Sequence, residues 1–182
     1  ASGVSVQYPN RFLFGESAWT IETWFRRGTD DTGDLVRYES YNADSFRLGI
    51  ENGFPIGAIF NSGGDLVRVG GAKTADGADM ARLAEGEWNH LALVWAPEDH
   101  SLRLYVNGIS LIAKQTLTKP MIGAGEAFIG KGLDNGYLDE IRVWGEARSE
   151  AEIDRWINEV IPTRDTINTG SYSAMLYNQL AG

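Results

Sequence analysis

The stretch Trp88-Asn-His-Leu-Ala-Leu-Val-Trp95, followed closely by Leu102-Arg-Leu-Tyr-Val-Asn-Gly108, indicates a β-fold. In the second run Leu102, Leu104 and Val106 alternate with other residues, which is the period of a β-strand with one face in a core. Both alternating faces of the first run carry bulky apolar residues. It is therefore either a central strand covered on both sides or a strand with one face serving a ligand. The closing Asn-Gly pair tolerates the left-handed backbone of a two-residue hairpin turn.

Runs of the same kind recur along the chain and are separated by Gly, Asn and Asp. We expect eleven strands, over residues 4–8, 18–27, 34–40, 45–51, 54–60, 65–69, 88–96, 102–107, 109–115, 126–130 and 137–144. Strands at such even spacing, with turn residues between them and no helical periodicity, predict an all-β antiparallel sandwich or barrel.

One short helix is predicted near the C-terminus. Ser149 can cap its first turn while Glu152, three residues further on, bonds back to the cap. An apolar stripe follows, made of Ile153, Trp156, Ile157 and Val160. Pro162 ends the helix, and we expect the stripe to pack across one end of the sandwich.

The length of 182 residues fits one domain, because two independent cores would each have only about 90 residues. We assign residues 1–162 to this domain and residues 163–182 to a C-terminal tail that either adds a strand or contacts a partner. Apolar periodicity lapses between Gly70 and Gly86, which predicts a long surface loop. This loop is either a plain excursion between the sheets or a rim over a ligand face.

The composition excludes several classes of function. A formal net charge of −9 repels nucleic acid phosphates and anionic lipid, so we expect no nucleic acid partner. The chain has no cysteine, which excludes disulfides, thiolate catalysis and zinc–sulfur sites. No run approaches the roughly 20 apolar residues that span a bilayer, so we expect no membrane insertion. No leader precedes Ala1, although a leader or an initiator Met could already have been removed.

Three stretches stand out together, in this order and with these gaps. They are Trp19-Thr-Ile-Glu-Thr-Trp-Phe25, the two runs from Trp88 to Gly108, and Ile129-Gly with Gly136-Tyr-Leu-Asp-Glu-Ile-Arg-Val-Trp144 and the helix start Ala147 to Ile153. They resemble the laminin-G-like or pentraxin-like branch of the concanavalin A-like lectin and glucanase fold, over roughly residues 15–155. The resemblance implies a two-sheet antiparallel jelly-roll sandwich whose concave face or loop rim binds sugars or proteins, and which often carries calcium.

Asp139 shares the predicted strand 137–144 with Ile141 and Val143 and falls on their side, so the pleat aims its carboxylate at the apolar face. A bare buried carboxylate is costly and needs a compensating partner. The resemblance implies a structural Ca²⁺ here, bound by this Asp and by backbone carbonyls. The alternative is an Asp that accepts backbone N–H bonds from the neighbouring loop.

A second set of candidate calcium ligands follows the second predicted strand. Asp30, Asp31 and Asp34 offer three carboxylates within five residues, which suits a hard cation. The order does not match an EF-hand, so a solvated acidic turn is the competing interpretation. Asp134 and Asn135 mark another position at the ligand rim, as candidate ligand-binding residues.

Aromatic side chains are candidates for a sugar platform, because the apolar C–H face of a sugar stacks on Trp or Tyr rings. Trp95, Tyr105 and Trp144 fall opposite the best core alternation in their strands. They are therefore candidate ligand-binding residues, although each is also an ordinary residue of a packed sandwich.

The sequence does not indicate an enzyme. His90 lies within a strand with no Ser or Cys nucleophile beside it, and His100 lies in a turn. Hydrolytic members of the resembled fold keep two acids as Glu-x-Asp-x-x-Glu on one strand, since the carboxylates must flank a glycosidic bond about 5 Å apart. That spacing is absent, and so are the P-loop, HExxH and G-x-S-x-G motifs.

We therefore predict a non-catalytic binding module, with lectin-like carbohydrate binding or adhesion, at an extracellular, cell-surface or virion-surface location. Its predicted cofactor is a structural Ca²⁺, and its partner is a carbohydrate or a protein surface. The alternative is a structural decoration or fibre-associated interaction protein of a phage virion or another surface assembly, as an oligomer or in a larger assembly. Domains of the resembled fold occur in both settings, so the resemblance does not separate them.

Overall fold

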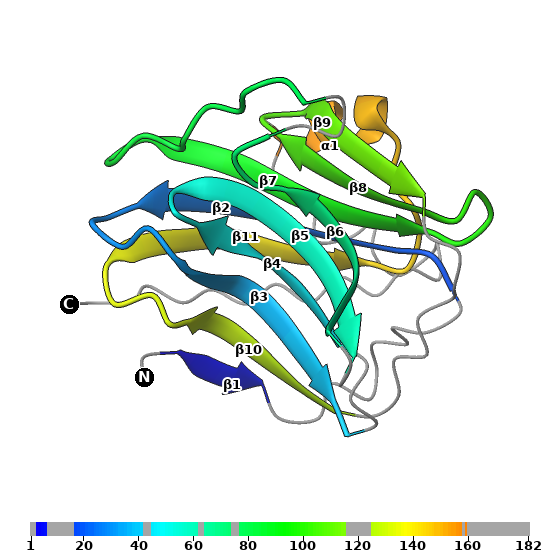
Figure 1. Ribbon diagram of the computed structural model, residues 1–182, viewed down its shortest axis with the longest axis horizontal. Helices are drawn as coiled ribbons and strands as arrows, with labels where there is room; N and C mark the ends of the chain where they lie inside the picture. Colours follow the sequence, from blue (N-terminus) through cyan, green and yellow to red (C-terminus); the bar gives the residue numbers. More distant parts are fainter. Residues whose placement is uncertain are drawn as a thin grey trace.

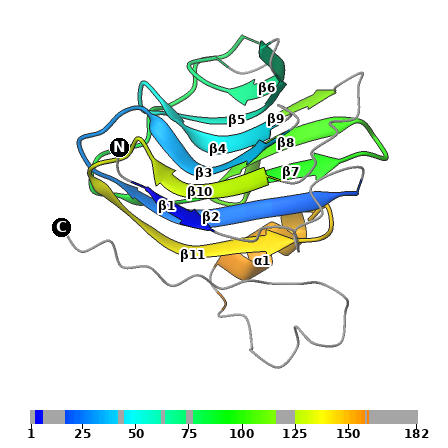
Figure 2. The ribbon, with the colours of Figure 1, turned by 90° about the horizontal axis from the view of Figure 1, so that it is seen from below.

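The computed structural model describes residues 3–6, 17–41, 45–61, 64–73, 77–115, 125–157 and 159. Within these residues, eleven strands form two antiparallel sheets packed face to face, and one helix lies on the outer side of one sheet (Figures 1 and 2). The predicted two-sheet sandwich with one short helix is therefore confirmed. The tail from residue 163 and residues 7–8 of the first predicted strand lie outside the described residues.

The six-stranded sheet has the order β1-β10-β3-β4-β5-β6. Its strands are β1 (Val4–Val6), β3 (Gly33–Ser40), β4 (Ser45–Glu51), β5 (Phe54–Asn61), β6 (Gly64–Gly70) and β10 (Gly125–Lys131). β4 and β5 are joined by Asn52 and Gly53, which have φ values of 51° and 77°. Two successive left-handed residues suit the twist of a tight hairpin, which is why the pair is Asn-Gly.

The five-stranded sheet has the order β11-β2-β7-β8-β9. Its strands are β2 (Trp19–Arg27), β7 (Trp88–Ala96), β8 (Ser101–Val106), β9 (Ile109–Gln115) and β11 (Gly136–Trp144). Asn107 and Gly108 have φ values of 53° and 82° and connect β8 to β9, so the predicted two-residue turn is confirmed.

The main hydrophobic core fills the space between the sheets. The ring of Phe46 in β4 lies 4.7 Å from Trp19 of β2 and 5.7 Å from Tyr38 of β3, between ring centroids. Other buried members are Ile21, Phe25, Leu35, Leu48, Ile50, Leu91, Leu93, Trp95, Leu102 and Leu104. Removal of this apolar surface from water is the dominant favourable term in folding, and it fixes which residues of each strand face outward.

β7 is covered on both faces, as its two apolar faces predicted. Leu91, Leu93 and Trp95 point into the main core, whereas Ala92 and Val94 point to the opposite side of the sheet. That outer side carries the helix α1 (Glu150–Ile157), drawn in orange in Figures 1 and 2.

The capping box predicted for α1 is confirmed. The Ser149 amide and hydroxyl each lie 2.8 Å from Oε2 of Glu152, and the Glu152 amide donates to the Ser149 hydroxyl. Ile153 packs on the outer face of the sheet with Ala92, Val94 and Tyr105, not across one end of the sandwich as predicted. Val160 and Pro162 lie outside the described residues.

Candidate functional site

The three aromatic residues predicted to bind a sugar are buried. Trp95 is 0% exposed in the main core, Tyr105 is 3% exposed beneath α1, and Trp144 is 5% exposed. A ring must present a free face to stack on a sugar, so the prediction that these rings form a ligand platform is wrong. Alternation along a strand does not show what covers its second face, and here α1 and Ala147 before it cover the part of the outer face where Tyr105 lies.

Asp139 does not point into the core. A β-bulge separates the pairs Asp139↔Trp24 and Arg142↔Glu22, and Glu140 within it has a φ of 50°. The extra residue shifts the alternation, so Asp139 is exposed on the outer face and accepts a hydrogen bond from the Glu140 amide at 2.8 Å. The premise that this carboxylate is buried among apolar side chains is therefore wrong.

The turn that carries Asp30 and Asp31 lies beside the predicted rim residues Asp134 and Asn135. The contacts between them are hydrogen bonds from backbone amides to Asp30. Oδ2 of Asp30 accepts the amides of Asp134 and Asn135, each at 2.6 Å, and so ties the β2–β3 turn to the β10–β11 turn. Asp31 is exposed, and its Oδ1 accepts a bond from the hydroxyl of Thr32.

Asp34 is engaged in ion pairs on the outer face of the six-stranded sheet. Its Oδ2 lies 3.1 Å from Arg37 and its Oδ1 lies 3.6 Å from Arg47. The predicted calcium ligands are thus dispersed, and no group of three or more His, Cys, Asp or Glu side chains that could hold a metal occurs among the described residues. These carboxylates do not fit a calcium site, and calcium binding stays a prediction from the family resemblance.

Replacing Asp139 by alanine tests the calcium assignment directly. We expect the variant to melt within a few degrees of the wild type, with the same difference in 5 mM Ca²⁺ as in EDTA, since about 1 kcal/mol or less is typical of an exposed side chain. The measurement is thermal unfolding by circular dichroism. A Ca²⁺-dependent stabilisation of the wild type that Asp139→Ala abolishes would restore Asp139 as a calcium ligand.

An open cavity of about 340 Å³ lies beside these turns. Its lining residues come from the end of the sandwich where β2 ends and β11 begins, and these strand ends lie at the left of Figure 1. Its lining consists of Arg26, Arg27, Gly28, Thr29, Glu85, Gly86 and Tyr137. Glu85 and Gly86 end the long loop predicted between residues 70 and 86. A Cβ on Gly28 would meet Asn135 at 2.8 Å, so the predicted rim residue Asn135 packs closely against Gly28 but is not itself among the lining residues.

Two exposed aromatic rings flank an arginine beside this cavity. Arg26 of β2 pairs with Tyr137 of β11 on one side and with Trp88 of β7 on the other. Cross-strand partners project from the same face of a sheet about 5 Å apart, so the three side chains form one row. Tyr137 is 54% exposed and Trp88 is 44% exposed, in contrast to the buried rings of Trp95 and Trp144.

The two arginines of the cavity have different contacts. Arg27 donates from Nε to the Leu83 carbonyl at 2.8 Å and lies 3.5 Å from the Glu85 carboxylate, so it anchors the long loop. Arg26 donates from Nε to the Gly86 carbonyl at 2.8 Å, and its guanidinium carbon lies 5.6 Å from the Tyr137 ring centroid. Within the described part of the chain, no carboxylate lies within ion-pair distance of Arg26.

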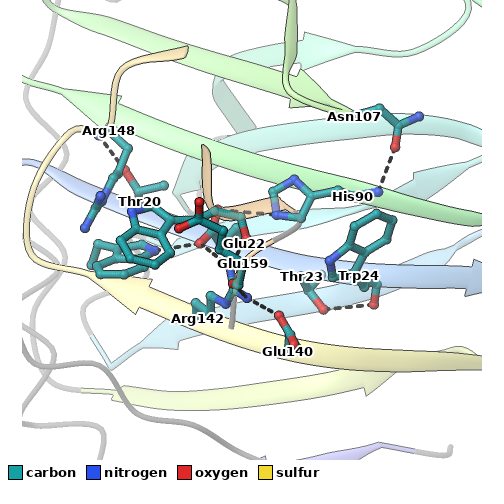
Figure 3. A network of polar contacts seen from close by, with 12 residues as sticks. Thr20, Glu22, Thr23, Trp24, His90, Asn107, Glu140, Arg142, Arg148 and Glu159 are labelled. Atoms are coloured by element: carbon teal, nitrogen blue, oxygen red, sulfur yellow. Dashed lines mark hydrogen bonds and ion pairs between the residues drawn. The ribbon is translucent and has the colours of Figure 1, made fainter. Parts of the chain in front are cut away.

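Further along the same outer face, a buried ionic network surrounds Glu22 (Figure 3). Its Oε1 accepts Nε1–H of Trp144 at 2.8 Å and lies 3.5 Å from Arg142, while its Oε2 lies 3.3 Å from His90. Arg142 also pairs with Glu140. Its Nη1 donates to the carbonyl of Trp156 at 2.8 Å, which is a favourable position for a cation at the C-terminal end of α1.

The network holds Glu22 ionised. Burial by itself raises the pKa of Glu22, but the contact and charge of His90, the hydrogen bond from Trp144 and the charge of Arg142 outweigh it and lower that pKa below its usual range. Because these side chains are buried, the network fixes α1 on the sheet rather than meeting a ligand.

A laminin-G family model, described as concanavalin A-like lectin/glucanases superfamily, matches residues 1–154. The chain belongs to this superfamily. A search of the curated proteins found no relative by sequence.

Several solved structures share the fold of this chain, although their sequences are only weakly similar to it. The binding domain of Paraclostridial Mosquitocidal Protein 1 is 18% identical, with a TM-score of 0.63 over 85% of this chain and 40% of that one. The Ruminococcus gnavus IT-sialidase CBM40, bound to α2,3 sialyllactose, is 15% identical, with a TM-score of 0.63 over 85% of this chain and 96% of that one.

A heptameric SAP-like pentraxin from Limulus polyphemus is 17% identical, with a TM-score of 0.55 over 79% of this chain and 72% of that one. Identities this low show the fold alone. Within the described part of this superfamily member, no helix has the length and apolar character needed to cross a membrane.

Proposed function

We propose that the chain is a non-catalytic carbohydrate-binding module that holds a sugar at the cavity beside Tyr137, Arg26 and Trp88. The observation that carries the proposal is this row of side chains. Tyr137 and Arg26 line the cavity, and Trp88 continues the row on the next strand. Two exposed aromatic rings and a guanidinium side by side offer apolar faces for sugar C–H groups and N–H donors for hydroxyls.

The comparisons support a binding role. Several similar structures are named as binding domains, including the receptor binding domain of botulinum neurotoxin D and a putative carbohydrate binding protein from Bacteroides ovatus. The CBM40 structure contains sialyllactose. We propose that this module binds glycans at a surface or outside the cell.

The cavity also favours binding over hydrolysis. Glu85 is the one carboxylate among the seven residues that line it, and this side chain is next to Arg27. Glycoside hydrolysis uses two carboxyl groups that flank the scissile bond. A leech intramolecular trans-sialidase also resembles the chain, but the match covers only 25% of that enzyme.

A glycan array tests the proposal. We expect saturable binding to a related set of glycans, and affinities at least about tenfold weaker in Tyr137→Ala and in Trp88→Ala, because each substitution removes a stacking face. Tyr41→Ala is the matched control, since Tyr41 is also an exposed ring but lies at the end of β3 in the other sheet. All three variants should keep the wild-type circular dichroism spectrum.

A blank array would contradict the proposal, and so would binding that survives both substitutions. A blank array would favour the structural decoration or fibre-associated protein, whereas binding that survives both substitutions would place the sugar at another site. The tail from residue 163, which that alternative uses to contact a partner, lies outside the described residues. Loss of binding in EDTA would support the separate prediction of calcium.

A further inference from the structure

We infer that the ligand is an acidic sugar, and that Arg26 takes its carboxylate while the sugar ring lies on Tyr137 or Trp88. This inference rests on the proposed function, because it names the class of ligand that the same site selects. It is carried by the contacts of Arg26, which differ from those of the arginines that the protein pairs with carboxylates. Arg82 also has no ion pair among the described residues, but the ring that it contacts, Phe54 at 5.3 Å, is half-buried and not exposed.

Most arginines of the described chain are paired with carboxylates. Arg37 and Arg47 pair with Asp34, Arg103 pairs with Asp99, and Arg142 pairs with Glu22 and Glu140. Arg27, the neighbour of Arg26 in the cavity, lies beside Glu85. These cations are already neutralised by the protein, so they offer little to an anionic ligand.

Arg26 differs because its protein contacts occupy only part of the guanidinium. Nε donates to the Gly86 carbonyl, and the guanidinium carbon lies 5.6 Å from the centroid of the Tyr137 ring. These contacts orient the guanidinium, yet the structure shows no carboxylate beside it within the described residues. The two terminal nitrogens therefore remain as a planar pair of donors, which matches the two oxygens of a carboxylate.

The spacing of the row suits a carboxylate attached directly to a sugar ring. Tyr137, Arg26 and Trp88 occupy neighbouring strands, so each aromatic side chain is about 5 Å from the arginine at its base. A sugar ring stacked on either aromatic would carry its carboxylate across one strand spacing to the guanidinium. A neutral sugar on the same ring would leave this donor pair facing water.

The overall charge makes the position of this cation informative. The chain carries a formal net charge of −9, so its mean field disfavours anions. Arg26, which has no carboxylate partner among the described residues and lies between two exposed rings, supplies a local positive charge that can attract an anion despite this field. Because the attraction is between a surface charge and an ion, it should weaken as salt increases.

Isothermal titration calorimetry with matched pairs of acidic and neutral sugars measures the affinities that test the inference. The probes are α2,3-sialyllactose against lactose, and a glucuronic acid-terminated oligosaccharide against its glucose-terminated counterpart. We expect at least one acidic probe to bind at least tenfold more tightly than its neutral partner. Arg26→Gln should abolish this difference, and Arg26→Lys should retain part of it. Arg155→Gln, which removes an exposed arginine of α1, should leave it unchanged.

The outcomes separate the inference from the proposed function. Equal binding of acidic and neutral partners, lost in Tyr137→Ala, would overturn the inference and leave carbohydrate binding intact. A preference for the acidic partner that persists undiminished in Arg26→Gln would also overturn it. No binding of any probe, together with a blank glycan array, would overturn both.

Discussion

Replacing Glu22 by alanine should lower the free energy of unfolding by about 3–5 kcal/mol, the cost typical of breaking a buried ion pair by removing one partner. The substitution leaves Arg142 with one carboxylate fewer and removes the acceptor of Trp144 Nε1–H. It also removes the carboxylate beside His90. Urea unfolding followed by fluorescence measures the loss.

Glu126→Ala is the matched control for Glu22→Ala, because Glu126 is also a strand glutamate but is exposed on β10. It should change the free energy of unfolding by no more than about 0.5 kcal/mol. Equal effects of the two substitutions would show that the network around Glu22 contributes no more than a surface charge.

The contribution of Glu22 to the free energy of unfolding should depend on pH, and the direction of this dependence follows from its pKa. The folded-state pKa of Glu22 is lowered, so ionised Glu22 stabilises the fold above the usual carboxylate range. That stability is lost as the pH falls through the folded pKa. The difference in unfolding free energy between the wild type and Glu22→Gln should therefore be largest near neutral pH and shrink in acid.

Replacing Trp95 by alanine should destabilise the fold by about 3–5 kcal/mol, because it opens a cavity in the core between the sheets. Trp95 is fully buried with Leu91 and Leu93, so this loss follows from packing and not from a ligand site. Trp88→Ala changes the same residue type in the same strand at an exposed position. We expect it to cost less than about 1 kcal/mol.

Thermal and urea unfolding of these two variants distinguish a core ring from a platform ring. Trp95→Ala should unfold at clearly lower urea concentration, whereas Trp88→Ala should keep its stability and lose glycan affinity. A stable Trp95→Ala that loses only glycan binding would contradict the buried position of this ring and restore the sequence-based prediction.

The strands were predictable because their signals are local. Alternation as in Leu102, Leu104 and Val106 reports which face of a strand is buried, and Asn107-Gly108 reports a turn without reference to the rest of the chain. The same alternation gave the wrong side for Asp139, because the bulge at Glu140 inserts a residue that the pattern does not show.

The candidate site was harder to predict because it depends on pairing between distant strands. Arg26 and Tyr137 are far apart in the sequence, and only the order β11-β2-β7 brings them beside Trp88. Trp88 and Tyr137 begin the predicted strands 88–96 and 137–144. Trp19 and Trp144 also lie at strand ends and are buried, so an aromatic residue at a strand end does not by itself identify the site. The burial of Tyr105 required knowing where α1 lies.

Nuclear magnetic resonance of the tryptophan side chains tests the location of the site most directly. The six indole N–H signals are recorded during titration with α2,3-sialyllactose, and Trp88→Phe assigns the signal of Trp88. We expect the Trp88 signal to shift saturably, while the signals of buried Trp19 and Trp95 stay in place. A Trp88 signal that does not move while another indole shifts would contradict this location.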